Sequence, residues 1–143
     1  MALPQGTLNR LKGAVNVSTY PSLNVIADNL AEDGVSLSFE GDVTDMINTL
    51  TGRVTSPSVY VGATMTINLL KTQNLASLYK AQMESLSTIG DVVFYSDSST
   101  LPSYSLTNCS IQRVNEITAN GKDAKFSVTI GGTYLVNQKL YTI

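Results

Sequence analysis

Three carboxylates lie close together in the chain and are the first candidates for chemistry. Glu40, Asp42 and Asp45 fall within a glycine-containing stretch. A pair of such acids can hydrolyse a glycosidic bond, and several acids can bind calcium. Their spacing, however, lacks the regular odd positions and the closing Glu of an EF-hand loop. Asp and Glu near glycines more commonly form turns, so we predict neither catalysis nor a metal site here.

Nucleophilic and metal chemistry find few residues elsewhere. The chain has one cysteine, Cys109, and no histidine, which argues against zinc sites and the usual catalytic triads. Cys109 stands among apolar residues, and we interpret it as a small buried side chain. No phosphate-binding loop motif is present. The sequence therefore predicts a protein that is not an enzyme and uses no cofactor.

Charge disfavours several classes of partner. The 143 residues carry a formal net charge of −2, and only 14% of them are charged. Basic residues form no cluster larger than a pair such as Lys122 with Lys125, whereas phosphate-driven binding of nucleic acid needs many clustered Lys and Arg. A surface along which DNA slides without sticking remains compatible. No apolar run reaches the length of a membrane span, and the N-terminal residues lack the pattern of a signal peptide. Low charge also permits self-association.

Residues 59–70 predict an unusually long strand. Alternate positions are apolar, namely Val59, Val61, Ala63, Met65, Ile67 and Leu69. Between them lie Tyr60, Gly62, Thr64, Thr66 and Asn68, so the second face is polar but uncharged. Twelve residues extend roughly 40 Å at about 3.3 Å per residue. Such a strand can outrun the core of one small domain and pair outside its own subunit.

Residues 41–57 show no period of two. The apolar residues at 43, 46, 47 and 50 fit one face of a short helical turn, which is one interpretation. The other is a long loop that reaches a neighbouring molecule as an arm, since compact domains rarely keep long unstructured loops without a use for them.

The remaining elements complete the predicted fold. Helical spacing over 73–89, ended by Gly90, predicts one helix. Alternating segments at 13–19, 35–40, 91–96, 104–114 and 125–136 predict strands, with a bulge between Leu106 and Cys109. Asn120–Gly121 predicts a hairpin turn, and Gly131–Gly132 predicts a break or bend. We expect one domain spanning 1–143, mainly β, an antiparallel β-sandwich or small barrel with one α-helix packed on the outside and a long loop arm.

Several segments together resemble the tail tube proteins of bacteriophages with contractile tails. They are residues 48–73, 89–96, 108–114 and 128–137, and the stretch beginning at Gly13 also looks like the start of that family. Related tubes occur in pyocins and type VI secretion systems. The resemblance implies a homo-hexameric ring that stacks on other rings into a hollow tube, with the helix outside and a long loop touching the adjacent ring.

The resemblance also implies partners and a location. The tube would lie in a virion tail, assembled in the host bacterial cytoplasm, and would meet sheath, tape-measure, baseplate and tail terminator proteins. DNA would pass through during ejection without specific binding. On this basis Tyr60, Thr64, Thr66 and Asn68 face the lumen or a neighbouring subunit. The residues expected in the inter-ring loop are Asp42, Asp45, Met46, Ile47, Leu50 and Arg53. The alternatives are a type VI or pyocin-like delivery tube and a lone β-sandwich that binds carbohydrate or protein.

Overall fold

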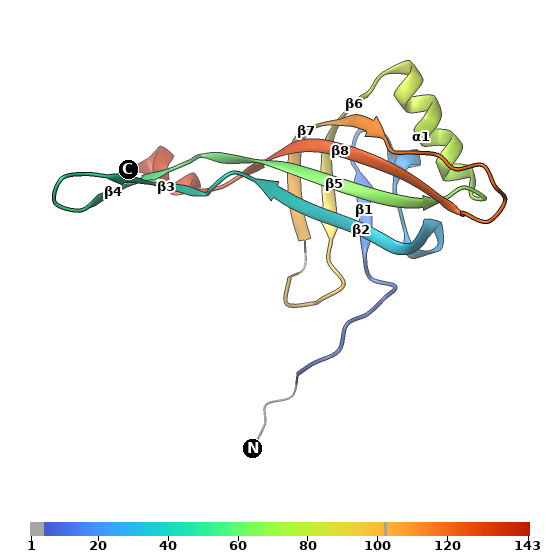
Figure 1. Cartoon of the computed structure of the whole chain (residues 1–143), viewed down its shortest axis with the longest axis horizontal. Helices are drawn as coiled ribbons and strands as arrows, with labels where there is room; N and C mark the ends of the chain where they lie inside the picture. Colours follow the sequence, from blue (N-terminus) through green and yellow to red (C-terminus); the bar gives the residue numbers. More distant parts are fainter. Residues whose placement is uncertain (1–4, 102) are drawn as a thin grey trace.

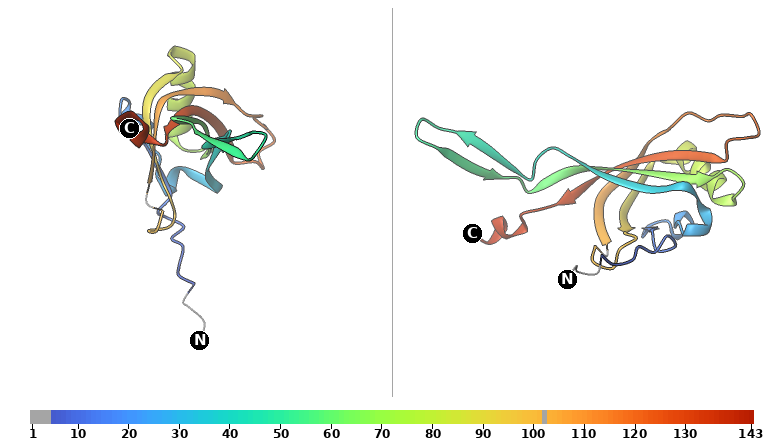
Figure 2. Two further views of the ribbon diagram at one scale, coloured as in Figure 1. Left: turned by 90° about the vertical axis from the view of Figure 1, so that its left-hand side faces the viewer. Right: turned by 60° about the horizontal axis from the view of Figure 1, so that its bottom comes forward.

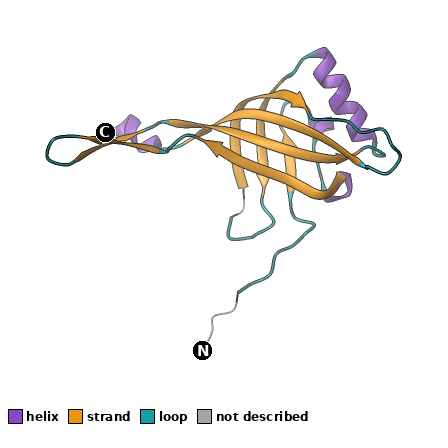
Figure 3. Cartoon of the chain, viewed as in Figure 1, coloured by secondary structure: helices purple, strands orange, loops and turns teal. Residues whose placement is uncertain are grey.

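The chain forms a curled antiparallel sheet from which a narrow two-stranded arm projects (Figure 1). A computed structural model describes residues 5–101 and 103–143. Strands dominate it (Figure 3). The strands are β1 (Ala14–Val17), β2 (Leu30–Glu40), β3 (Thr44–Asn48), β4 (Arg53–Pro57), β5 (Tyr60–Leu70), β6 (Thr88–Tyr95), β7 (Ser103–Val114) and β8 (Lys125–Leu135). The helix α1 is Asn74–Ser85, and the short 3-10 helices are η1 (Pro21–Leu23), η2 (Ala27–Asn29) and η3 (Gln138–Thr142).

Six strands make the body of the molecule in the order β1-β6-β7-β8-β5-β2, each antiparallel to its neighbours. The sheet curls into a half-barrel (Figure 2). Register shifts interrupt the β2–β5, β6–β7 and β7–β8 ladders. Such bulges bend a strand and increase its twist, which is how a sheet of long strands curls. The predicted mainly β, antiparallel fold with one helix is confirmed.

One face of this sheet carries the core. The alternation of β5 is realised as predicted, because Met65, Ile67 and Leu69 are completely buried. Residues of β8, β7 and β6 in register with β5 extend the same face. The helix closes it with Leu75 and Tyr79, and the Tyr79 hydroxyl donates to the carbonyl of Leu23 at 2.8 Å. The helix thus covers the core face of the sheet.

Residues 41–57 correct one prediction. They form neither a loop nor a helical turn but the hairpin β3–β4, paired from Thr44 with Pro57 to Asn48 with Arg53. Almost every residue of the two strands is exposed. Because neither face is buried, nothing selects alternating apolar and polar side chains, and the sequence carried no period of two.

Glycines account for two further corrections. The helix ends at Ser85, and Gly90 lies inside β6 with φ +79°, next to two register shifts. β8 runs unbroken through Gly131 and Gly132. A side chain at Gly132 would lie 2.5 Å from the Cys109 Sγ, so this glycine makes room for a neighbouring strand.

Two features of the last three strands follow the expected turn chemistry only in part. The bulge predicted between Leu106 and Cys109 is present as a shift between Thr107 and Ser110, with Asn108 at φ 52°. Asn120–Gly121 does lie in the β7–β8 connection, but that connection spans 115–124 and is not a tight turn.

Within the described residues, no helix is long and apolar enough to cross a membrane.

Candidate assembly surfaces

The face of the sheet opposite the core is rich in hydroxyl groups. Cross-strand pairs such as Ser36 with Thr66, Thr66 with Thr129, and Asn68 with Ser127 come from β2, β5 and β8. We call this surface the polar face, and its members are Ser36, Ser38, Tyr60, Thr64, Thr66, Asn68, Ser127, Thr129 and Thr133. Glu40, in register with Gly62, and Arg113, in register with Thr129, add one charge of each sign, so the face carries hydrogen-bonding groups without a cluster of charge.

The four residues predicted for this surface differ in exposure. Tyr60 is 57% exposed, and Thr64 and Thr66 are half-buried. Thr64 donates from its hydroxyl to Glu40 at 2.8 Å. Asn68 is only 7% exposed; it donates to the carbonyl of Gly34 at 3.0 Å and accepts from the Ser127 hydroxyl at 2.6 Å. Its polar atoms are therefore used within its own subunit.

The β7–β8 connection covers one end of the polar face. Asn115 donates from its amide to the Thr129 hydroxyl at 3.3 Å, and the Lys71 ammonium donates to the carbonyl of Thr118. A hollow of about 350 Å³ remains beneath this connection, lined in part by Thr66, Asn68 and Glu116. The open part of the polar face is consequently the end near Tyr60 and Thr64.

The two edge strands of the body are not equivalent. Residue 15 of β1 exchanges two backbone hydrogen bonds with Val25, at 3.0 and 2.8 Å, so the short edge is covered. In the part of the chain that the structure describes, β2 pairs only with β5, and its outer edge is unpaired. An unpaired edge of this length is a template for another chain.

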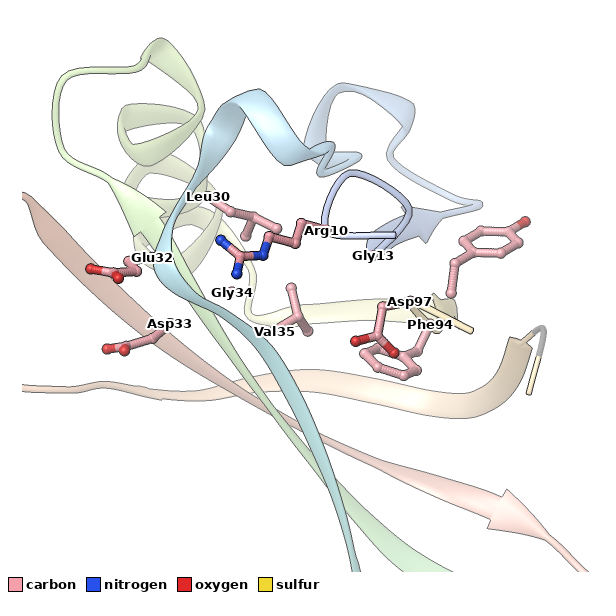
Figure 4. Close-up of a pocket in the computed structure, with 10 residues that line it drawn as sticks. Arg10, Gly13, Leu30, Glu32, Asp33, Gly34, Val35, Phe94 and Asp97 are labelled. Atoms are coloured by element: carbon pink, nitrogen blue, oxygen red, sulfur yellow. The ribbon is translucent and has the colours of Figure 1, made fainter. Parts of the chain in front are cut away.

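A cleft of about 460 Å³ lies between the N-terminal segment and β2 (Figure 4). Arg10 reaches into it from one side, while Val35 of β2 and Phe94 of β6 line it from others. Its charged groups are of both signs, with Glu32, Asp33 and Asp97 beside the single arginine. This mixture gives no preference for an anionic ligand.

The hairpin β3–β4, Thr44–Pro57, is referred to below as the arm. It stands away from the body (Figure 1) and is fixed at its base, where Ser58 donates to the carbonyl of Val43 at 2.8 Å. The Asn137 amide donates to the same carbonyl at 3.1 Å and to that of Ser58 at 2.7 Å. The arm therefore has a defined direction relative to the sheet.

The structure gathers most of the predicted inter-ring residues on this arm. Asp45, Met46 and Ile47 lie on β3, and Arg53 begins β4. Leu50 lies in the turn and is 102% exposed, and Asp42 precedes the arm. Half-exposed Met46, Ile47 and Val54 leave apolar surface along its length. Glu40 instead accepts the Thr64 hydrogen bond, and among the described residues no group of three or more acids, cysteines or histidines could hold a metal ion.

An aromatic cluster near the base of the arm was not apparent in the sequence. The ring centroids of Phe39, Tyr104 and Tyr134 lie 5.2 to 5.7 Å apart. They come from β2, β7 and β8, so no local pattern connects them, and the tyrosines are scattered along the sequence.

Cys109 is completely buried, and burial, with a smaller contribution from Asp91, raises the pKa of its thiol to about 11. A thiol protonated at neutral pH is a poor nucleophile.

Comparison with known proteins gives a likeness of fold. No protein-family model and no curated protein sequence matches the chain. A chain in the solved structure of the virion of a native gene transfer agent particle superposes with a TM-score of 0.60 and 7% sequence identity. The match covers 87% of this chain and 95% of that chain. Over most of its length the chain thus shares its fold with a chain of that particle.

Proposed function

We propose that the chain is a structural subunit of a phage-like particle, in which it builds the hollow inner tube of a contractile tail. Copies would form stacked rings, and the number of six per ring rests on the sequence resemblance. The tube would be a conduit for DNA ejection, enclosed by a sheath and bounded by baseplate and terminator proteins. The likeness of fold to a chain of a gene transfer agent virion supports a virion role.

The arm is the observation that carries this proposal. It is a regular hairpin whose residues are nearly all exposed, so its own subunit gains little from ordering it. Ordering backbone costs about 1–2 kcal/mol per residue, and exposed apolar groups on both strands leave that cost uncompensated in an isolated molecule. A second copy that covers the arm would supply the missing burial. The unpaired edge of β2 offers a second surface for the same purpose.

The polar face supports the conduit. It lies opposite the core and therefore opposite α1, so a ring with the polar face inward would carry its helices outward. Hydroxyl and amide groups are wetted without retaining phosphate, whereas Lys and Arg would hold DNA by counterion release. Tyr60, Thr64 and Thr66 are the residues we assign to the lumen or to the neighbouring subunit. Asn68 would act by fixing β2 and β8 to β5 from within the subunit.

Removal of the arm tests the proposal. Val43 and Ser58 already lie within hydrogen-bonding distance, so residues 44–57 can be replaced by Asn-Gly, which favours a tight hairpin turn. The six-stranded body would be unchanged. We expect wild-type protein to form rings or hollow filaments in negative-stain micrographs, and the arm-less variant to remain a folded monomer by sedimentation velocity.

The matched control shortens a different connection. Replacing residues 119–122 of the β7–β8 connection by Asn-Gly leaves the arm intact and should leave polymerisation intact. Polymers formed equally well without the arm would refute its role. A wild-type chain that stays monomeric at millimolar concentration would refute the tube and favour a lone β-sandwich binding module.

The lumen assignment has its own test. Tyr60→Arg puts a cation on the open end of the polar face, away from the acidic hollow beside Thr66. Tubes should still assemble but should retain duplex DNA at low salt and release it at high salt. Ala81→Arg on the exposed side of α1 is the control. Tyr60→Arg tubes that retain no more DNA inside than this control would count against the assignment.

A further inference from the structure

The base of the arm contains an apolar hollow, which we call the root pocket. It has a volume of about 170 Å³ and lies where β2, β5, β7 and β8 approach the arm. Its lining residues are Phe39, Gly41, Val43, Val61, Tyr104, Tyr134 and Val136. No charged side chain lines it, so an occupant must be uncharged and apolar to avoid desolvating a charge without a partner.

The walls of the root pocket are held in place by their own packing. Phe39, Tyr104 and Tyr134 contact one another in tilted and edge-on arrangements, with centroids 5.2 to 5.7 Å apart. Phe94 extends the cluster, 6.3 Å from Tyr104. Phe39 is nevertheless 43% exposed. A large apolar ring left half in water beside a preformed hollow is the arrangement expected of a socket whose partner is absent.

The opposite end of the arm presents a matching side chain. Leu50 is the most exposed large apolar residue among those the structure describes. Its turn is ordered, because Thr49 donates to the carbonyl of Gly52 at 2.8 Å and Gly52 donates to the Thr49 hydroxyl at 3.1 Å. The backbone of the turn therefore holds Leu50 at the tip of the arm, so docking costs little additional ordering of the chain.

Leu50 cannot enter the root pocket of its own molecule. The ladder between β3 and β4 is uninterrupted over its five pairs. Val43 lines the pocket, and at about 3.3 Å per residue the seven residues from there to Leu50 span roughly 23 Å. A straight hairpin of that length cannot fold back on its base. The apolar side chain and the hollow that suits it can meet only between two molecules.

We infer that the root pocket of one copy binds Leu50 of another copy. This inference rests on the proposed self-assembly and names the contact through which the arm acts. A cavity of roughly 150 Å³ in a protein core accommodates benzene, so the volume suffices for a leucine side chain. When each copy gives its Leu50 to one neighbour and receives Leu50 from another, the contact is head-to-tail. Such contacts repeat into closed rings or open filaments rather than stopping at a dimer.

Cross-linking between differently labelled copies tests the contact. One protein carries Leu50→Cys and the other carries Val43→Cys, so a product between the two can only be intermolecular. The native Cys109 is completely buried and does not compete. We expect a short bis-maleimide to join residue 50 of one copy to residue 43 of the other. The control partner carries Leu86→Cys, which is 55% exposed and follows α1, at the other end of the body from the arm (Figure 1), and we expect it to yield at most background product.

Two substitutions measure the contribution to assembly. Leu50→Asp should raise the concentration needed for polymerisation by about tenfold or more, as is typical of a residue central to an interface. Val43→Trp fills the pocket from its rim and should do the same, whereas Leu86→Asn, an exposed residue after α1, should leave assembly unchanged. Circular dichroism of all three variants should match wild type, because none of these side chains is part of the core.

The outcomes separate this inference from the proposed function. Wild-type polymers with no preference of residue 50 for residue 43 over residue 86 would overturn the contact and leave the tube standing. Polymers that form equally well from Leu50→Asp would do the same. A wild-type chain that never polymerises would overturn both.

Discussion

Gly132 allows a quantitative test of how β7 and β8 pack. A methyl group at this position would lie 2.5 Å from the Cys109 Sγ, 3.4 Å from the carbonyl oxygen of Thr107 and 3.5 Å from Leu106 Cβ. The sulfur belongs to a completely buried side chain, so it cannot move into solvent. Gly132→Ala should therefore force a shift between two central strands.

The expected loss follows from two opposing effects. Overpacking a core costs about 2 kcal/mol, and replacing a strand glycine by alanine returns about 0.5 kcal/mol. The net loss in free energy of unfolding is about 1.5 kcal/mol, which lowers the urea midpoint by about 0.7 M for a slope near 2 kcal/mol/M. Unfolding should be followed by circular dichroism at one fixed protein concentration, because association would itself add stability.

Two further variants decide whether the cause is the one given. Gly131→Ala meets the Gln112 side chain, which is exposed and can swing aside, so its midpoint should stay close to wild type. Cys109→Ala alone should destabilise by about 1 kcal/mol. The double variant Cys109→Ala with Gly132→Ala should lose less unfolding free energy than the sum of the two single losses, by about 1 kcal/mol or more. Additive losses, or equal losses at both glycines, would refute the reasoning.

Three other changes have defined outcomes. Tyr79→Phe removes the buried donor to the carbonyl of Leu23 and should cost about 1.5 kcal/mol of unfolding free energy in urea; an unchanged midpoint would contradict it. Asn68→Ala leaves Ser127 and a backbone carbonyl without their partner and should cost about 2 kcal/mol, whereas a cost below that of Thr66→Ala would show that the pair contributes nothing. The Cys109 thiol has its pKa raised from 9.0 to about 11, so its contribution to stability is intact below pH 9 and is lost as pH rises toward 11. Unfolding midpoints measured across that range should fall less steeply for Cys109→Ala than for wild type.

Burial explains which parts of the fold were predictable from sequence. The strand at 60–70 packs one face on the core, so its alternation was strong, and it begins one residue later than predicted. It does not outrun the sheet of its own subunit, because β8 pairs with it from Tyr60 to Leu70. Tyr79 and Leu75 likewise mark the helix by their spacing. The arm has no buried face, and without burial the pattern that distinguishes a strand from a helix is absent. The chance spacing of Met46, Ile47 and Leu50 then imitated a helical turn.

Glycine was ambiguous for a different reason. At Gly90 the sequence indicated the end of a helix, but the positive φ serves a bulge within β6. At Gly132 it indicated a bend, but the missing side chain serves the packing of Cys109. Glycine satisfies both the requirement for a positive φ and the requirement for no side chain. Only knowledge of the neighbouring strand shows which requirement applies at a given position.

The candidate surfaces were predictable in part for the same physical reason. Tyr60, Thr64 and Thr66 do lie opposite the core. Asn68 is covered by the β7–β8 connection, which is distant from it in sequence. The root pocket depends on three strands whose aromatic residues share no local period.

The register shifts along the curled sheet bear on how this protein can change in evolution. Four register shifts interrupt the pairing of β6 with β7 and of β7 with β8. A residue inserted in a strand between two of these shifts would move every later side chain of that strand to the opposite face of the sheet. A residue inserted in the connection at 115–124 or in the turn at 49–52 would not change the face on which any strand side chain lies. Lineages sharing this architecture should therefore gain and lose residues at those two places, with the distance between register shifts kept constant.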